Sequence, residues 1–313
     1  MSNIEWLEAY RLDDFQFFRQ WITEEWARDG GTIKKDLSLP WLAKVAVAKL
    51  GLVFPLPGIF RKKTKLIVTC GGDPAYMVWP WCYRYELVPV VWDCWPRYWQ
   101  RMDRFIKRLN IKTIFCTSSQ TAAYLRKENP NLTAVWLPEG VKSDEYPVGG
   151  PLRDRSIDIL ELGRQMPSVH NALVSSEGCR KINHVYSKSG ELLFKDFKEL
   201  TNGLRQSKVT VCYPRCDTNP EQAKDIETLT QRYWECMLSG TVIAGRAPKE
   251  LIEICGYNPV VDLGEDITEN ILRIVNNIDH YQELVDKNRK CAEQKADWRY
   301  RLPIIKKAFK EAE

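Results

Sequence analysis

Short apolar runs that alternate with helix-like segments organise most of the chain. Lys65-Leu-Ile-Val-Thr-Cys is such a run and ends in Gly71-Gly72, which is typical of a buried parallel strand followed by a tight turn. Similar runs recur along the chain, beginning at Leu87, Thr113, Ala134, Ile157, His184, Lys208, Thr241 and Pro259. Helix-like segments such as 98–109 separate them. The pattern predicts an α/β protein with parallel sheets.

The alternation is interrupted once, by a stretch rich in turn-forming residues over 139–156. A chain of 313 residues also fits two domains better than one. We therefore predict two Rossmann-like domains, residues 1–147 with a helical lead-in over 1–60, and residues 148–298. A C-terminal helix over 299–313 is expected to pack back on the first domain. Ligands of open α/β sheets bind at the carboxyl ends of the strands, so two facing sheets predict a cleft.

Composition and charge narrow the class of protein only a little. With 44% hydrophobic and 28% charged residues the chain has enough apolar mass for packed cores, and this excludes a disordered or fibrous protein. The net charge of +5 does not demand a nucleic-acid partner. Ten cysteines without any C-x-x-C and only three histidines argue against a zinc site. Free thiols and the lack of a signal-peptide pattern favour the cytoplasm.

The longest apolar stretch, 42–60, has two interpretations. Lysines and prolines interrupt it, so it is too broken to span a bilayer. It can be a core helix with snorkelling lysines, or, together with the basic residues up to Lys63, a surface that lies on an anionic membrane. The second interpretation would place the protein peripherally at the inner face of the membrane, through residues 42–63.

The segment from Glu227 to Gly240 carries the most informative chemistry. Thr228 and Gln231 form a capping-box pattern that predicts a helix start, and Gly240 predicts its end. Glu227 would then precede the helix and Glu235 lie within it, with eight helical residues, roughly 12 Å, between the two carboxylates.

Between these carboxylates, the backbone N–H groups of Thr228, Leu229 and Thr230 would lie at the positive end of the helix, where phosphate binds well. Two hydroxyl acceptors on either side of a phosphate site describe a nucleotide-sugar. The alternative is that both glutamates are ordinary solvated charges.

The stretch Glu227–Gly245 resembles the E-x7-E segment of the family 4-type glycosyltransferases of the two-domain GT-B fold. Leu137-Pro-Glu-Gly-Val-Lys-Ser-Asp-Glu-Tyr is similar to the linker signature of that family, and Ile159-Leu-Glu-Leu-Gly-Arg164 is similar to its strand-then-Gly-Arg turn. The three pieces occur in the order of the family, and the resemblance spans roughly residues 65–300.

The resemblance implies a retaining, metal-independent hexosyltransferase that needs no cofactor and uses a nucleoside-diphosphate sugar, most often a UDP-sugar, as donor. Glu227 would hold the hydroxyls of the transferred sugar and Glu235 those of the ribose. Arg164 would neutralise the leaving diphosphate, and Gly71-Gly72 would let the backbone approach it. The chain departs from the family at His170, where a lysine is usual.

The acceptor stays open at this stage. Asp93, at the end of a first-domain strand, is our candidate for contact with it. A glycan or lipid-linked hydroxyl is one interpretation, and a hydroxymethylated base in DNA is another, for which the basic segment Arg97–Arg108 is the only indication. A nucleotide-sugar-binding module that has lost transfer activity is a third, suggested by His170. No obligate protein partner is indicated.

Overall fold

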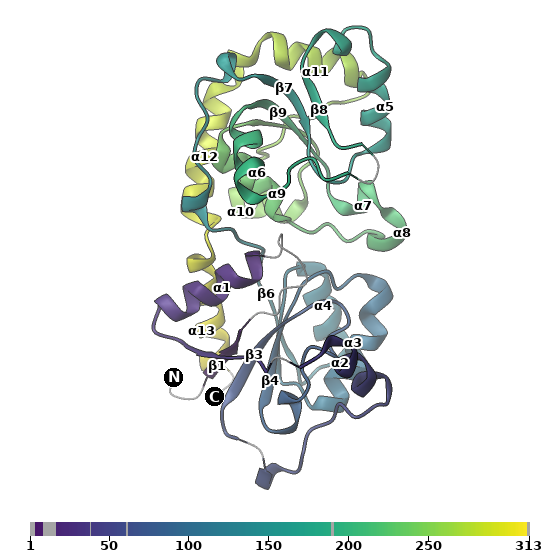
Figure 1. The fold of residues 1–313 in the computed structure, drawn as a ribbon, viewed down its shortest axis with the longest axis vertical. Helices are drawn as coiled ribbons and strands as arrows, with labels where there is room; N and C mark the ends of the chain where they lie inside the picture. The colour runs from purple at the N-terminus through teal and green to yellow at the C-terminus, as the bar shows by residue number, and fades with distance from the viewer. Residues whose placement is uncertain (1–3, 9–16, 38, 61, 189–190, 312–313) are drawn as a thin grey trace. The chain divides into compact units, whose positions relative to one another are not determined.

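The computed structural model describes residues 4–8, 17–37, 39–60, 62–188 and 191–311. The backbone separates into two compact units, each built on a parallel sheet (Figure 1). Unit 1 comprises the chain up to Pro138, Gln222–Ile226 and the segment from Trp298 onwards; unit 2 comprises Glu139–Glu221 and Glu227–Asp297. The chain first passes from unit 1 to unit 2 after Pro138, whereas the predicted boundary is at 147. The predicted α/β class with two Rossmann-like sheets is confirmed.

Unit 1 contains a six-stranded sheet in the order β2-β1-β3-β4-β5-β6, with every pair parallel. The strands are β1 (Ile4–Leu7), β2 (Thr32–Lys34), β3 (Lys65–Cys70), β4 (Glu86–Val91), β5 (Thr113–Cys116) and β6 (Thr133–Trp136). The helices are α1 (Phe17–Arg28), α2 (Trp41–Lys49), η1 (Gly58–Phe60), η2 (Trp81–Tyr83), α3 (Pro96–Leu109), α4 (Ser119–Glu128), η7 (Trp298–Arg301) and α13 (Leu302–Glu311). In Figure 1, α1 and α13 lie on one side of this sheet and α2, α3 and α4 on the other.

Two of these strands correct the prediction of a purely helical lead-in. β1 and β2 lie within residues 1–60, where only α1 and α2 agree with the expectation. β1 has four residues and β2 three, which is too short for a periodic signal. Pairing with a neighbouring strand makes these short segments strands. In β1, Trp6 lies opposite Ile67 of β3 and is fully buried, so both the neighbouring strand and the core stabilise it.

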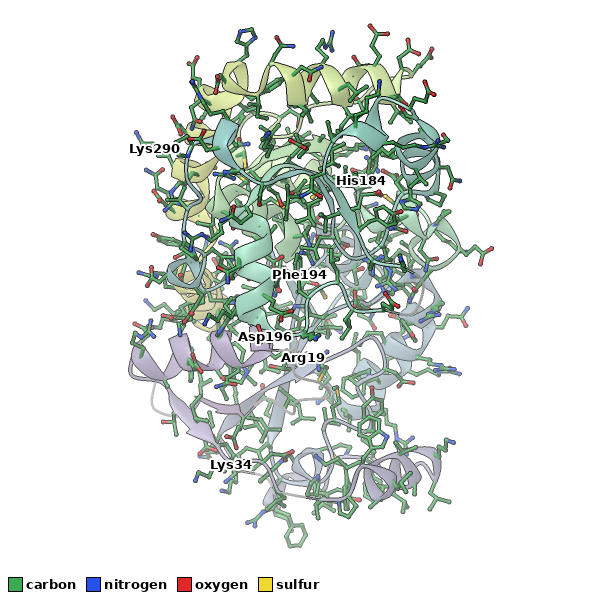
Figure 2. All side chains as sticks on the ribbon, turned by 45° about the horizontal axis from the view of Figure 1, so that its top comes forward. Arg19, Lys34, His184, Phe194, Asp196 and Lys290 are labelled. Carbon is green, nitrogen blue, oxygen red and sulfur yellow. The ribbon has the colours of Figure 1, made fainter. Side chains whose placement is uncertain are left out.

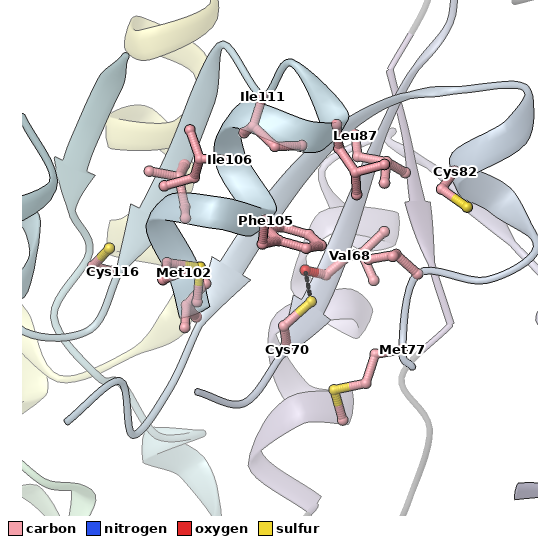
Figure 3. Close-up of a cluster of buried hydrophobic side chains, with 14 of the residues drawn as sticks. Val68, Cys70, Met77, Cys82, Leu87, Met102, Phe105, Ile106, Ile111 and Cys116 are labelled. Atoms are coloured by element: carbon pink, nitrogen blue, oxygen red, sulfur yellow. Dashed lines mark hydrogen bonds between the residues drawn. The ribbon is translucent and has the colours of Figure 1, made fainter. Parts of the chain in front are cut away.

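One core of unit 1 lies between the sheet and α3 and includes cysteines as small apolar side chains (Figure 3). Phe105 and Met102 of α3 pack with Val68 and Cys70 of β3. The Cys70 thiol donates to the Val68 carbonyl at 3.4 Å, and burial raises the pKa of this thiol to about 12. The Cys70 thiol is therefore neutral and acts as a small apolar side chain of the core.

The C-terminal segment belongs to unit 1. Trp298 is fully buried, with its ring centroid 5.9 Å from that of Trp92, and Phe309 of α13 lies edge-on to Phe115 of β5 at 6.1 Å. Arg301 donates from Nε to the Pro138 carbonyl at 2.9 Å. The last helix therefore packs on unit 1, where Phe309 contacts β5.

Unit 2 contains a four-stranded parallel sheet in the order β10-β9-β7-β8. The strands are β7 (Ile157–Glu161), β8 (His184–Tyr186), β9 (Ser207–Cys212) and β10 (Val242–Gly245). The helices are η3 (Ser143–Glu145), η4 (Leu152–Asp154), α5 (Pro167–Ser175), η5 (Cys179–Lys181), α6 (Phe197–Arg205), α7 (Arg215–Thr218), α8 (Pro220–Ala223), α9 (Gln231–Ser239), α10 (Lys249–Cys255), α11 (Ile267–Asn276), η6 (Ile278–Tyr281) and α12 (Gln282–Lys295). The run at Pro259, expected as a strand, makes only a single bridge from Val261 to Ala244.

Candidate functional site

The predicted site residues fall into one group in each unit. Gly71, Gly72 and Asp93 follow β3 and β4 of unit 1. The remaining residues belong to unit 2: Arg164 and His170 follow β7, Glu227, Thr228, Leu229 and Thr230 lie between α8 and α9, and Glu235 lies in α9. The residues after β3, β4 and β7 are thus at the carboxyl ends of parallel strands, where α/β proteins bind ligands.

In unit 1, the two glycines after β3 have different surroundings. A Cβ on Gly72 would lie 2.5 Å from a ring carbon of Tyr98 and 2.8 Å from the carbonyl oxygen of Asp93, whereas one on Gly71 would meet nothing within 4 Å. Packing against Tyr98 therefore accounts for Gly72 without a ligand, and Gly71 is the glycine that leaves open space. Asp93 is exposed and has a left-handed backbone, with φ of 51°.

We predict that Gly72→Ala lowers the free energy of unfolding by about 1–3 kcal/mol, because the new methyl group must displace the Tyr98 ring or the Asp93 carbonyl. Gly71→Ala is the matched control and should change stability by less than about 0.5 kcal/mol. Chemical denaturation of both variants checks this. Equal stabilities would contradict the different packing of the two glycines.

In unit 2, the helix that carries Glu235 begins later than predicted. α9 starts at Gln231 with Thr230 as its N-cap and without a side-chain cap, so the capping box of Thr228 and Gln231 is wrong. Between Glu227 and Glu235, the chain is helical only from Gln231 onwards. The prediction of eight helical residues between the two carboxylates is therefore also wrong. Thr228 is buried, and no hydrogen-bond partner for its hydroxyl is found in the described structure.

Protein carboxylates occupy part of the predicted phosphate site. The Leu229 N–H donates to Oε2 of Glu250 at 2.7 Å, and the Gln231 N–H donates to Oε2 of Glu139 at 3.2 Å. Leu229 itself is fully buried. These N–H groups do bind anionic groups, but the anions are carboxylates of the protein itself. The N–H of Leu229 is therefore already taken by Glu250.

Glu227 is held by a cation and a helix terminus. Its Oε1 accepts from Arg246 at 2.8 Å, and its Oε2 accepts from the Lys249 N–H at 3.1 Å. Arg246 also pairs with Asp217 at 2.6 Å. Burial disfavours the charged carboxylate, but the Arg246 and Lys249 hydrogen bonds outweigh it and lower the pKa of Glu227. Glu227 is thus an ionised acceptor with a fixed orientation.

Glu235 is a buried carboxylate, 4% exposed. The Tyr146 hydroxyl donates to its Oε1 at 3.0 Å, and Arg232 pairs with its Oε2 at 3.2 Å. Burial, followed by the charge of Glu235, raises the pKa of Tyr146 well above its ordinary value, so Tyr146 stays a donor. Glu235 is therefore a fixed acceptor as well.

Arg164 and His170 follow β7. Arg164 is exposed and comes after Gly163, whose φ of 83° turns the chain out of the strand. His170 lies in α5, with its Nδ1 atom 2.8 Å from Oε1 of Glu161, the last residue of β7. Nε2 of His184 lies at the same distance from the same oxygen. The structure thus adds Glu161 and His184 to the surroundings of His170.

Sequence analysis missed several residues of this site. Glu161 and Arg246 stand at or directly after the carboxyl ends of β7 and β10, and Glu250 is 2% exposed in α10. One signal was available: an acidic residue inside the apolar run Ile157-Asp-Ile-Leu-Glu-Leu indicates a buried charge that needs a partner. The partners themselves come from distant segments and leave no local pattern.

The charges of Glu227 and Arg246 predict a pH dependence of stability. Because the pKa of Glu227 is lowered in the folded state, the pair stabilises the fold above the ordinary value of 4.5 and loses this contribution as the pH falls through the folded value. We expect Arg246→Ala to be less stable than wild type at about pH 7, by about 1 kcal/mol or less because Arg246 is 38% exposed. The difference should shrink at about pH 4.

Urea denaturation at the two pH values measures this difference. Arg153→Ala, which removes an ion pair whose side chains are 67% and 53% exposed, is the control and should change little at either pH. A deficit of Arg246→Ala that is the same at both pH values would contradict the assignment to Glu227.

No family model matches the sequence, and no curated protein matches it. Solved structures do match its fold. Sucrose-phosphate synthase from Thermosynechococcus elongatus has a TM-score of 0.64 at 11% identity, over 99% of this chain and 98% of that one. A glycosyltransferase from Rickettsia africae ESF-5 has a TM-score of 0.55 at 11% identity, over 99% of both chains.

A third match is an alpha-glucosyltransferase in complex with UDP and a 13-mer DNA that contains an HMU base, with a TM-score of 0.58 at 10% identity, over 97% of this chain and 98% of that one. At such identities the likeness shows the fold alone. The chain has the GT-B fold, with two Rossmann-like domains, that these glycosyltransferases share.

Proposed function

We propose that the protein is a metal-independent glycosyltransferase that moves a hexose from a nucleoside-diphosphate sugar, most simply a UDP-sugar, to a hydroxyl group. One observation supports the proposal: unit 2, in a fold shared with glycosyltransferases, holds two carboxylates in fixed orientations and carries Arg164 on the turn after β7. Glu227 is ionised and oriented by Arg246, and Glu235 is oriented by Tyr146. Arg164 supplies a positive charge on the turn after β7, and His170 follows on α5.

In the proposed reaction, Glu227 accepts hydrogen bonds from hydroxyls of the sugar and Glu235 from those of the ribose. A carboxylate offers about four acceptor positions, so its bonds to Arg246 and Lys249 do not by themselves exhaust Glu227. Arg164 and His170 stabilise the negative charge that develops on the departing diphosphate. Gly71 in unit 1 leaves room for a close approach of the diphosphate, and Asp93 contacts the acceptor.

Retention of configuration follows if the acceptor attacks on the face from which the diphosphate leaves. The bond from the acceptor oxygen to the anomeric carbon forms, and the bond from that carbon to the phosphate oxygen breaks with its electron pair. The acceptor proton passes to the phosphate oxygen. No protein nucleophile is needed. The carboxylate pair of glycoside hydrolases would instead flank a single bond.

Substitutions in unit 2 test this proposal. Glu227→Gln and Arg164→Ala should each lower kcat/KM for transfer by about 100-fold, because each removes a charged contact to the donor. Glu221→Gln and Arg153→Ala, at exposed positions of the same unit, should retain wild-type rates. A thermal-shift screen of nucleotide sugars selects the donor for the assay. Wild-type rates in both site variants would rule the assignment out, and donor binding without hydrolysis or transfer would support a binding module.

For the acceptor, we propose a hydroxyl group on a glycan or lipid-linked precursor, reached from an anionic membrane surface at the cytoplasmic face. The supporting observation is an apolar surface on the segment 42–60 of unit 1. Six large apolar side chains are exposed there: Leu42 79%, Leu50 73%, Leu52 44%, Phe54 39%, Ile59 87% and Phe60 58%. Lone exposed apolar residues are ordinary, but six within one segment indicate an interaction surface.

The charge around this surface suits a lipid bilayer with anionic headgroups. The sequence contains six Lys or Arg residues and no acidic residue between Asp36 and Asp73. Lys49, Lys62 and Lys63 are exposed, whereas Lys44 is buried and paired with Asp36 at 2.8 Å. α2 has only nine residues, and no helix in the described parts of the chain is long and apolar enough to cross a membrane. Apolar side chains between exposed lysines are typical of a peripheral membrane contact.

DNA is the competing acceptor. The basic helix α3, which would contact its phosphates, has several of its cations already engaged. Arg101 pairs with Asp73 at 2.9 Å, Arg97 lies over the Tyr98 ring, and Arg108 donates to the Gly51 carbonyl. Several of the cations that would contact phosphates therefore have partners within unit 1. This observation favours the membrane over a duplex.

Flotation with vesicles of phosphatidylcholine, with and without about a third of phosphatidylglycerol, tests the membrane contact. We expect binding that requires the anionic lipid and falls at least about tenfold in Ile59→Asp/Phe60→Asp, since two inserted side chains are lost. Leu192→Asp, at an equally apolar position 71% exposed in unit 2, is the control and should bind as wild type. Absence of flotation, or salt-sensitive binding to a DNA duplex instead, would overturn the proposal.

A further inference from the structure

A buried carboxylate in unit 2 contacts two histidine rings. The Glu161 side chain is 2% exposed, and its Oε1 lies 2.8 Å from Nδ1 of His170 and 2.8 Å from Nε2 of His184. His184, labelled in Figure 2, lies on β8, whereas His170 lies on α5. The Tyr186 ring covers both imidazoles, with centroid distances of 4.9 Å and 4.8 Å. Three secondary-structure elements thus bring two of the three histidines of the chain to one oxygen.

The hydrogen bonds define which nitrogen atoms carry hydrogen. An ionised carboxylate only accepts, so Nδ1 of His170 and Nε2 of His184 must both donate to it. Nε2 of His170 is then the ring nitrogen that does not contact Glu161. Both contacts are of hydrogen-bond length to a single oxygen, and the described residues contain no group of three or more His, Cys, Asp or Glu arranged to hold a metal ion. The cluster is therefore a hydrogen-bonded one.

The two rings differ in how far a ligand can reach them. A carboxylate this deeply buried is costly unless hydrogen-bond donors surround it, and both imidazoles lie within hydrogen-bond distance. His184 is 7% exposed and His170 is 22% exposed, so His170 is the ring that a ligand can contact. Arg164 stands six residues before His170, on the turn that follows β7. The carboxylate would thus orient His170 next to the place proposed for the diphosphate.

We propose that Glu161 is a positioning residue for donor binding: it orients the His170 ring through Nδ1 so that Nε2–H contacts the diphosphate in the complex, with His184 and Tyr186 keeping the carboxylate in place. The inference rests on the proposed function. It explains how a histidine can act at a position where a permanently charged lysine would need no such support. Glu161 touches no substrate and acts through His170.

Binding of uridine diphosphate compared with binding of uridine, both by calorimetry, tests the proposal. We expect Glu161→Gln to weaken binding of uridine diphosphate by about 10- to 100-fold, as the loss of a charge-assisted contact would, and to leave binding of uridine unchanged. Asp158→Asn is the matched control, since it neutralises a carboxylate of the same strand that pairs with Lys208 at 2.6 Å. It should bind both ligands as wild type does.

A lysine at position 170 provides the second arm of the test. Lysine is charged without help from Glu161, so in the His170→Lys background Glu161→Gln should change binding of uridine diphosphate by less than about threefold. An equal loss of both ligands in Glu161→Gln, or an undiminished effect in the lysine background, would mean a purely structural role and overturn the proposal. Tight binding of uridine diphosphate by Glu161→Gln would overturn it while leaving the proposed function intact. Failure of the wild type to bind any nucleoside diphosphate would overturn both.

Discussion

The need to compensate buried carboxylates governs how the second unit is built. Glu161, Glu235 and Glu250 are at most 4% exposed, and a charge so deeply buried is costly unless donors or cations surround it. Glu161 contacts two histidine rings, and Glu235 contacts the Tyr146 hydroxyl and Arg232. Glu250 accepts from the Leu229 N–H. The Tyr146 contact joins α9 to a segment 89 positions away, whereas Arg232 lies three residues before Glu235 in the same helix. The turn after β7 and the approach to α9 are therefore held by charge, while the sheet is held by apolar packing.

The same constraint shapes what the second unit can do chemically. A glycosyl donor presents hydroxyls and a diphosphate, so it needs acceptors that stay ionised and cations that stay in place. Glu227 meets the first requirement because Arg246 and Lys249 orient it, and Arg164 with His170 meets the second in the proposed reaction. The phosphate site predicted at the start of α9 is different, because Glu250 and Glu139 already accept from N–H groups there. In the proposed reaction, Arg164 and His170 after β7 would instead contact the diphosphate that was expected at the helix terminus.

The first unit follows a simpler logic, in which apolar burial decides almost everything. Trp6, Trp298 and Phe309 enter its core from the two ends of the chain, and the cysteines of β3 and β5 fill space as neutral thiols. The apolar side chains of 42–60 differ from the rest of this unit, because six of them are exposed whereas most other large apolar side chains are buried in the core. Neither of the two sequence interpretations of this segment describes it fully: Lys44 is buried in a salt bridge, whereas Leu42 and Ile59 point outwards.

The sequence by itself determined the two parallel sheets, the helix α3 and the end of α9 at Gly240, since continuous apolar runs, amphipathic periodicity and a left-handed glycine are local properties of the chain. It also identified Glu227, Glu235, Arg164 and His170 as residues to examine. Only the tertiary structure decided that β1 and β2 are strands, because three or four residues become a strand only when a neighbouring strand offers its backbone. It likewise decided the long-range partners of the buried charges: Tyr146 and Glu235 are 89 positions apart, and two histidines from different elements share one oxygen of Glu161. An acidic residue in an apolar run indicates a buried charge, but burial and partners are properties of the folded chain, so the run does not identify the partner.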